Sequence, residues 1–198
     1  MNKKQLAIKL SRLKGFKEPK LQLEQYLLDS EIAAELLWNA YLNGDIKGKI
    51  VVDLGAGTGI LGYGALLLGA KRVYFIEKDK DVIGVAKKNV KSKKAVFVNT
   101  DVDKFYIKVD TVIQNPPFGT KNKHADRVFL EKAMQLSEHI YSLHKLTSKR
   151  FIKNLIKGRF IINIKEVEIP LKKSYGFHKS RIYYVNAGIW MLTRNRKF

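Results

Sequence analysis

The chain has 198 residues, 45% of them hydrophobic, and a formal net charge of +20, which is the composition of one globular domain with a strongly basic surface. It contains no cysteine, which excludes disulfides and thiolate metal sites, and its four histidines have no familiar zinc spacing, so we expect no metal. No apolar run has the roughly 18 residues of a membrane span, and residues 1–5 do not resemble a signal peptide; we therefore expect a cytoplasmic protein without membrane contact.

Residues 1–48 are expected to form an N-terminal extension, basic at first and then helical. Ser30 is placed to cap an amphipathic helix that ends near Gly44. Downstream, short apolar runs alternate with helical patterns, which predicts βαβ units and a parallel sheet. We expect strands at 49–54, 72–76, 95–98, 109–113 and 139–143, and helices at 60–68, 81–90, 126–137 and 148–157.

The last third of the chain changes character. Two long strand-like runs, 159–169 and 181–192, are separated by Pro170 and Gly176 and predict a C-terminal antiparallel hairpin. The fold class expected from the whole pattern is α/β and Rossmann-like, with a mostly parallel seven-stranded sheet that ends in this hairpin. Residues 1–198 are expected to form a single domain.

The basic residues gather in separate segments that could converge on one face. These segments are 3–20, 87–94, 145–159, 172–181 and 194–197. A nucleic acid is the natural partner of such a surface, and neutralising ~6 to 10 phosphates would make its binding strongly salt-dependent. The alternative is a compositional bias that places lysine on any solvated face.

A glycine-rich turn follows the first apolar strand. The segment Asp53-Leu54-Gly55-Ala56-Gly57-Thr58-Gly59 joins this strand to a helix, and glycines there let the backbone approach a ligand closely. The dinucleotide pattern Gly-x-Gly-x-x-Gly would need a glycine at Ile60, so a nicotinamide cofactor is disfavoured. The GxGxG form, preceded by Asp53, is typical of enzymes that use S-adenosylmethionine.

Carboxylates follow three successive predicted strands. Asp53 could order the methionyl end of the cofactor, Glu77 could accept both ribose hydroxyls, and Asp101 is placed to meet the adenine amine. Each of them alone could be a solvated loop residue. Because the carboxyl ends of parallel strands meet at one edge of a sheet, their joint occurrence favours a cofactor site there.

The segment Asn115-Pro116-Pro117-Phe118 ends the fourth predicted strand. Paired prolines have fixed φ and no N–H donors, so the turn is stiff and its carbonyls face few competing donors. The Asn115 side-chain oxygen and the Pro116 carbonyl can accept both hydrogens of an exocyclic NH2, while the ring of Phe118 can stack on a base. We therefore expect Asn115, Pro116, Pro117 and Phe118 to form the catalytic site. The alternative is a punctuation turn with Phe118 packed in the core.

The motifs together resemble the archaeal and eukaryotic N6-adenine methyltransferases that modify one adenosine of small-subunit ribosomal RNA. In the family's order, the chain has Leu23-Glu24-Gln25-Tyr26, Ile32-Ala33-Ala34, Asn115-Pro116-Pro117-Phe118-Gly119-Thr120-Lys121-Asn122, Tyr141-Ser142-Leu143-His144-Lys145 and Tyr175-Gly176-Phe177-His178-Lys179. The resemblance implies a class I methyltransferase fold, S-adenosylmethionine as cofactor, and RNA as substrate. Leu28 and Glu77 stand where the family often has threonine and aspartate.

The resemblance also assigns residues and partners. It places Gln25, Tyr26, Asp53, Gly55, Gly57, Gly59, Glu77, Asp101 and Asn115 at the cofactor. Phe118, Lys121, Phe177, His178 and Lys179 are expected on the substrate side, because they lie in the amine turn, in loops near it or in basic clusters; surface solubility is the alternative for the charged ones. His144 and Lys145 are expected at the rim of the site, with a structural histidine as the alternative for His144. A small zinc-binding activator protein is a possible second subunit. An edge beside residues 73–75 is a possible docking strand for it, with ordinary burial of these residues as the favoured alternative.

Other functions share parts of this pattern. Guanine-N2 and protein glutamine-N5 methyltransferases also use an Asn-Pro-Pro-aromatic turn, and the high basic charge favours RNA over protein as acceptor. A non-catalytic RNA-binding assembly factor could keep the fold without the chemistry, but the motifs are intact. The sequence therefore predicts methylation of an adenosine N6 in RNA.

Overall fold

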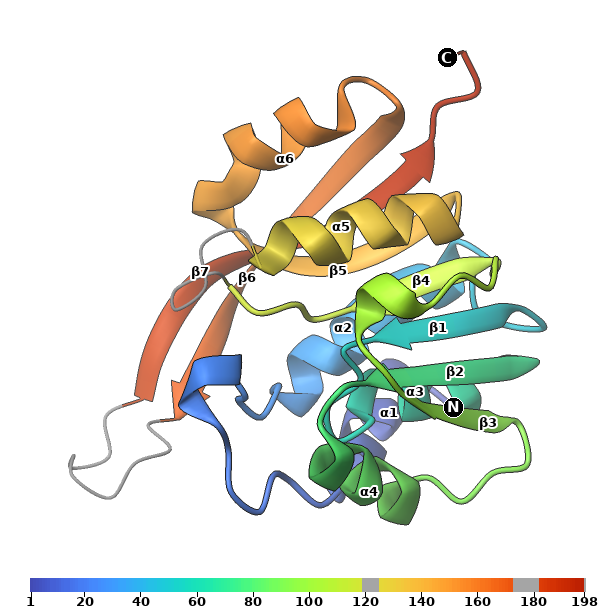
Figure 1. The fold of residues 1–198 in the computed structure, drawn as a ribbon, viewed down its shortest axis with the longest axis vertical. Helices are drawn as coiled ribbons and strands as arrows, with labels where there is room; N and C mark the ends of the chain where they lie inside the picture. Colours follow the sequence, from blue (N-terminus) through green and yellow to red (C-terminus); the bar gives the residue numbers. More distant parts are fainter. Residues whose placement is uncertain (119–124, 173–181, 198) are drawn as a thin grey trace.

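The computed structural model describes residues 1–118, 125–172 and 182–197, which build a seven-stranded sheet in the order β3-β2-β1-β4-β5-β7-β6 (Figure 1). The strands are β1 (Ile50–Leu54), β2 (Arg72–Glu77), β3 (Ala95–Asn99), β4 (Thr111–Gln114), β5 (His139–Lys145), β6 (Phe160–Lys172) and β7 (Ile182–Arg194). Strands β1 to β5 pair in parallel, whereas β7 is antiparallel to both β5 and β6. The predicted fold class and the C-terminal hairpin are confirmed.

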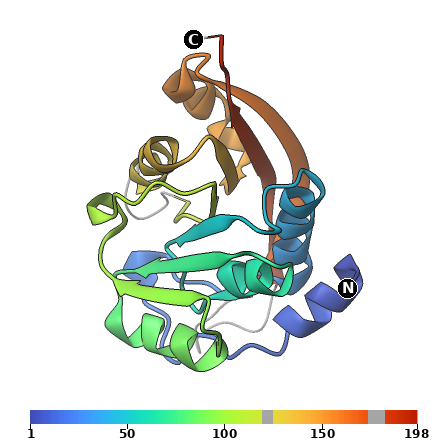
Figure 2. The ribbon, with the colours of Figure 1, turned by 90° about the vertical axis from the view of Figure 1, so that its right-hand side faces the viewer.

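Helices cover both faces of the sheet. They are α1 (Lys3–Leu10), α2 (Ser30–Leu42), α3 (Ile60–Leu67), α4 (Lys80–Asn89), α5 (Ala125–Leu136) and α6 (Lys149–Ile156), with short 3-10 turns at Leu21–Leu23, Val102–Lys104 and Leu146–Ser148. One buried cluster joins α1, α2 and α3 to the sheet, and a second joins α5 and α6 to the opposite face. Figure 2 shows α1 and α2 on one side of the strands and α5 and α6 on the other.

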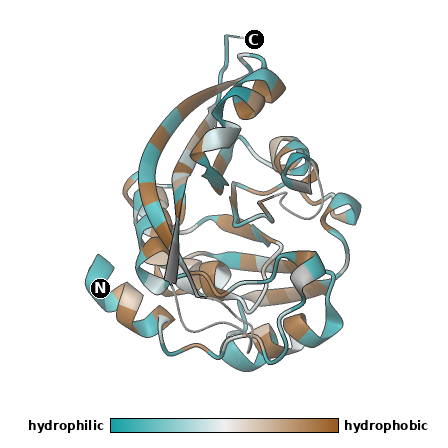
Figure 3. Ribbon diagram, turned by 90° about the vertical axis from the view of Figure 1, so that its left-hand side faces the viewer, coloured by the Kyte–Doolittle hydropathy of each residue, from teal (hydrophilic) through white to brown (hydrophobic). Residues whose placement is uncertain are grey.

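Burial on both faces explains the composition of the central strands. All four residues of β4 are buried, as are the last four of β1, so these strands read as nearly continuous apolar runs. The two strands of the hairpin, β6 and β7, are longer than the parallel strands. Hydrophilic and hydrophobic residues alternate along them (Figure 3).

The structure corrects four details of the sequence analysis. Helix α1 forms within the basic part of the N-terminal extension, and Asn2 and Gln5 form a capping box at its start. Asp29, not Ser30, caps α2, because its side chain accepts hydrogen bonds from the first backbone N–H groups. Pro170 lies inside β6, which tolerates it because β6 is an edge strand. Residues 73–75 lie in the interior strand β2, so the parallel edge of the sheet is β3.

None of the helices in the described parts of the chain is both long and apolar enough to cross a membrane.

Two helical glycines give opposite predictions for stability. A Cβ at Gly62 in α3 would lie 2.2 Å from the ring of Phe75, which is fully buried and stacks on Phe97. Gly62→Ala should lower the free energy of unfolding by about 1–3 kcal/mol because this ring has little room to move. A Cβ at Gly84 in α4 meets nothing within 4 Å, so Gly84→Ala should raise the free energy of unfolding by about 0.5–1 kcal/mol. Denaturant unfolding of both variants checks the prediction, which equal effects would contradict.

Candidate active site

A cavity of about 370 Å³ lies at the carboxyl ends of the parallel strands. Its walls come from the turn after β1, the ends of β2 and β4, the segment after β3, one side of α5, and residues of the N-terminal segment between α1 and α2. Figure 1 shows this N-terminal segment passing along the end of the sheet to which β1 points. The sheet topology thus brings together residues that are far apart in the sequence.

The glycine-rich turn forms the floor of this cavity. Gly55 has φ +67°, and a Cβ there would lie 2.7 Å from the ring of Phe129 on α5, so the position needs glycine for both reasons. Gly57 also lines the cavity, and Phe16 from the N-terminal segment lies over it. Gly59 lies outside the cavity wall, where it precedes α3 and packs against Ala86 of α4.

Asp53 is the most deeply buried carboxylate at the cavity. Its side chain is 1% exposed, and its Oδ2 accepts a hydrogen bond of 2.8 Å from the backbone N–H of Gly62. Burial raises the pKa of Asp53 to about 7, because the single hydrogen bond only partly replaces the lost hydration. The group is therefore poised to gain or lose a proton when a charged ligand arrives.

Glu77 connects the end of β2 to the glycine-rich turn. Its Oε2 accepts a hydrogen bond from Gly57 N at 3.0 Å, and its Oε1 accepts one from Asp79 N at 2.9 Å. Burial raises the pKa of Glu77 even though both hydrogen bonds favour the charged form. The carboxylate is held in place, and each oxygen keeps a lone pair for a ligand hydroxyl.

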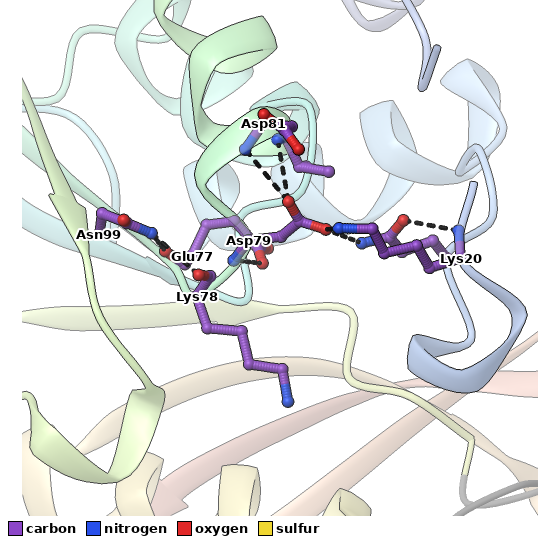
Figure 4. A network of polar contacts seen from close by, with 8 residues as sticks. Lys20, Glu77, Lys78, Asp79, Asp81 and Asn99 are labelled. Carbon is purple, nitrogen blue, oxygen red and sulfur yellow. Dashed lines mark hydrogen bonds and ion pairs between the residues drawn. The ribbon is translucent and has the colours of Figure 1, made fainter. Parts of the chain in front are cut away.

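Asp79 joins the N-terminal segment to the cavity (Figure 4). Its Oδ2 accepts hydrogen bonds from Lys20 Nζ at 2.7 Å and from Gln25 Nε2 at 3.1 Å. Its Oδ1 caps α4 by accepting from Asp81 N. Burial alone would raise the pKa of Asp79, but these hydrogen bonds outweigh it and hold the pKa below its usual range. This carboxylate holds Gln25, one of the expected cofactor residues, in the cavity wall.

Asp101 lies at the more open side of the cavity. Its Oδ1 accepts a hydrogen bond of 2.7 Å from Val102 N, and its side chain is 46% exposed, with Lys78 Nζ 4.0 Å away. Leu28, at the position where the resemblance suggested threonine, is buried and lines the wall. The cavity therefore has buried carboxylates at one side and a solvated one at the other.

The Asn-Pro-Pro-Phe segment lies where the cavity meets the end of β4. Asn115 and Pro117 line the wall, whereas Pro116 is buried behind them. The hydroxyl of Tyr26 donates a hydrogen bond of 2.6 Å to Asn115 Oδ1. Phe118 contacts the ring of Tyr26, with 5.5 Å between centroids, and Lys145 Nζ lies 5.6 Å from its centroid.

A buried polar group supports this turn from β5. Ser142 Oγ lies 2.7 Å from His144 Nε2 and accepts a hydrogen bond from Gln114 Nε2 at 3.0 Å. Burial lowers the pKa of His144 to about 3, so the ring is neutral at physiological pH. Gln114 directly precedes Asn115, so this group braces the start of the turn.

The sequence analysis missed several residues of the cavity. Phe16 and Phe129 line it, and the ion pair of Lys20 with Asp79 lies next to Gln25 of its wall; none of these four was among the expected site residues. Asp79 had a signal, since an acidic residue before a helical pattern is a typical N-cap. Four expected substrate residues, Lys121, Phe177, His178 and Lys179, lie outside the described residues. Within the described ranges, no group of three or more His, Asp or Glu side chains is arranged to hold a metal.

Comparison with known proteins identifies the family. Residues 29–140 match the methyltransferase small domain. The chain is 36% identical to the rRNA N6-adenosine methyltransferase METTL5 of Danio rerio over 91% of its length and 93% of that protein, and 36% identical to Mettl5 of Drosophila melanogaster over 91% of each. It is 44% identical to a crystal structure of a candidate RNA methyltransferase from Pyrococcus horikoshii, with a TM-score of 0.93 and 98% of both chains covered. The chain therefore belongs to the methyltransferase small-domain family.

Proposed function

We propose that this protein uses S-adenosylmethionine to methylate the exocyclic N6 amine of an adenosine in ribosomal RNA. The resemblance of its motifs to one methyltransferase family favours the RNA of the small subunit. The observation that carries the proposal is the position of Asn115, with Pro116 behind it, at the same edge of the sheet as the acidic cavity. The relatives named rRNA N6-adenosine methyltransferases support the choice of substrate.

The cavity fits the cofactor in size and in chemistry. Its volume of about 370 Å³ lies in the range of small-molecule sites, roughly 300–1,000 Å³. We assign Asp53 to the methionyl end, Glu77 to the ribose hydroxyls and Asp101 to the adenine amine. The full proposed cofactor set is Gln25, Tyr26, Asp53, Gly55, Gly57, Gly59, Glu77, Asp101 and Asn115. Gly59 lies outside the cavity wall, so its proposed part is to shape the glycine-rich turn.

The proposed mechanism is direct transfer. When bound, the cofactor would supply a methyl group on a positively charged sulfur. The sulfur–carbon bond would break as the carbon–nitrogen bond forms, and the sulfur would leave as a neutral thioether. Asn115 Oδ1 and the Pro116 carbonyl accept the two N6 hydrogens and draw the nitrogen lone pair out of conjugation, while Phe118 stacks on the base. Pro117 keeps the turn rigid. Proximity supplies most of the acceleration, and the methylated amine loses its proton to water without a general base.

The basic surface supports RNA as the substrate. The net charge of +20 favours phosphate contacts, and a target base that is unpaired or flipped out of the helix can reach the turn. We propose Phe118, Lys121, Phe177, His178 and Lys179 as substrate residues. With a ribosomal RNA substrate, we also propose a cytoplasmic location.

We also propose the domain organisation and the partner that the resemblance implies. Residues 1–198 form one methyltransferase domain with 1–48 as its N-terminal extension, and α1 and α2 pack into the same core as the sheet. A small zinc-binding activator protein is the second subunit. Among the described strands, β3 forms the parallel edge of the sheet, and this edge supports the proposal because it can accept a further strand.

Cofactor binding should release a proton at Asp53. The pKa of about 7 in the free protein means that Asp53 is mostly protonated at pH 6, and the cationic methionyl ammonium favours the carboxylate. Affinity should therefore rise from pH 5 to pH 7, by up to about tenfold per unit. Calorimetry at pH 6 in buffers of different ionisation enthalpy measures the released proton. Asp53→Asn keeps an acceptor for Gly62 N–H and should abolish the release; an equal release from this variant would contradict the assignment.

The ion pair between Lys20 and Asp79 should strengthen cofactor binding. Lys20→Gln removes the ion pair but leaves Asp79 to cap α4, so the N-terminal segment should hold the cofactor a few-fold less tightly. Lys17→Gln is the control, since Lys17 is an exposed lysine of the same segment and the change of charge is equal. Calorimetric affinities should differ at low salt and converge at high salt. Equal affinities at low salt would show that the ion pair does not hold the segment.

Asn115→Ala should lower the rate of methyl transfer by about 10²–10³-fold, because it removes an acceptor at the reacting nitrogen. The variant should still bind cofactor and RNA, and Asn195→Ala, which lies outside the cavity wall on the C-terminal segment, should behave as wild type. The assay supplies labelled cofactor with small-subunit ribosomal RNA, ribosomal proteins or release factor, and the methylated nucleoside is identified. Near-normal turnover by Asn115→Ala would refute the site, and label on guanine or on a glutamine amide would refute the substrate. Absence of cofactor binding would favour an RNA-binding scaffold.

A further inference from the structure

Tyr26 makes two contacts with the proposed catalytic turn. Its hydroxyl donates to Asn115 Oδ1 at 2.6 Å, and its ring lies 5.5 Å from that of Phe118 with 32° between the ring planes. These contacts join residues 89 positions apart in the sequence. Tyr26 comes from the N-terminal segment, directly after Gln25, which is bound by Asp79.

The hydrogen bond bears on the chemistry of the Asn115 amide. A carboxamide oxygen has two lone pairs, so Oδ1 can accept from Tyr26 and still accept one hydrogen of a substrate amine. If the amide rotated by half a turn, its NH2 group would face the amine, and two donors would meet. Asn115 can serve as an acceptor only in one of its two orientations.

The tyrosine hydroxyl selects that orientation. Burial raises the pKa of Tyr26 well above its usual range, so the hydroxyl keeps its proton at any physiological pH. Asn115 Oδ1 is the acceptor of this proton among the residues that the structure describes. A rotated amide would leave the proton of this partly buried hydroxyl without that acceptor, so the hydrogen bond favours the orientation with Oδ1 toward Tyr26.

We infer that Tyr26 is a positioning residue, whose hydroxyl keeps Asn115 Oδ1 turned toward the substrate amine. The inference rests on the proposed role of Asn115 in the transfer reaction. It assigns to Tyr26 an effect on the reaction step that is separate from its place in the cofactor wall. The hydroxyl leaves one lone pair of Oδ1 free, so it does not compete with the substrate for the whole acceptor.

Tyr26→Phe tests the inference, because it removes the hydroxyl and keeps the ring that packs on Phe118. We expect kcat to fall about tenfold, which corresponds to one lost hydrogen bond, while KM for RNA and the cofactor affinity stay within about twofold of wild type. Tyr141→Phe is the matched control. It removes a hydroxyl that donates to Asp45 Oδ2 over a distance of 2.5 Å. Tyr141 is not part of the cavity wall, so this change should leave kcat unchanged.

A double-mutant cycle with Asn115→Ala separates the two levels of the proposal. If Tyr26 acts through Asn115, then Tyr26→Phe should have little further effect on kcat once Asn115 is alanine. An unchanged kcat in Tyr26→Phe overturns the inference, as does a higher kcat, which would mean that the hydroxyl obstructs the amine. Loss of cofactor affinity with normal kcat also overturns it, because it would limit Tyr26 to the cofactor. Normal turnover by Asn115→Ala would instead refute the proposed function.

Discussion

The parallel pairing of β1 with both β2 and β4 is the constraint on which the site depends. In this register Asp53 lies opposite Phe75 in β2 and opposite Ile113 in β4. Glu77 and Asn115 each follow two residues later, so all three polar side chains reach the same edge of the sheet. A shift of one residue in either pairing would turn these side chains to the other face. The apolar residues that bury the central strands therefore also set the geometry of the proposed cofactor and amine sites.

The same arrangement places acidic groups inside a strongly basic protein. Asp53 and Glu77 are buried with raised pKa values, because burial disfavours their charged forms. Backbone N–H groups of Gly62 and Gly57 offset part of this cost. A cation in the cavity would offset more, whereas the surplus of lysine and arginine suits a polyanion outside. The two kinds of charge thus match a cationic cofactor and a nucleic acid without competing for one surface.

The sequence predicted those parts of the fold and site that local patterns encode. The glycine-rich turn, the strand-end carboxylates and the Asn-Pro-Pro-Phe turn each combine a backbone requirement with a side chain within a few residues. The roles of Lys20, Phe16 and Phe129 depend on contacts across large sequence separations, such as the 59 positions between Lys20 and Asp79, which no local pattern records. The sequence analysis expects Pro170 between the two hairpin strands, whereas it lies inside β6. A proline is tolerated there because β6 is an edge strand of the described sheet, and only the strand order reveals this.

The N-terminal segment links the two halves of the site. Neighbouring residues contact different halves, because Gln25 binds Asp79 beside the proposed cofactor site whereas Tyr26 binds Asn115 at the proposed amine site. A displacement of this segment would break both hydrogen bonds together, and it would also move Phe16 away from the glycine-rich turn. In the proposed reaction, the segment that lines the cavity therefore also completes the acceptor for the amine. On this geometry, a closed cavity and a correctly oriented Asn115 are two consequences of the same packing.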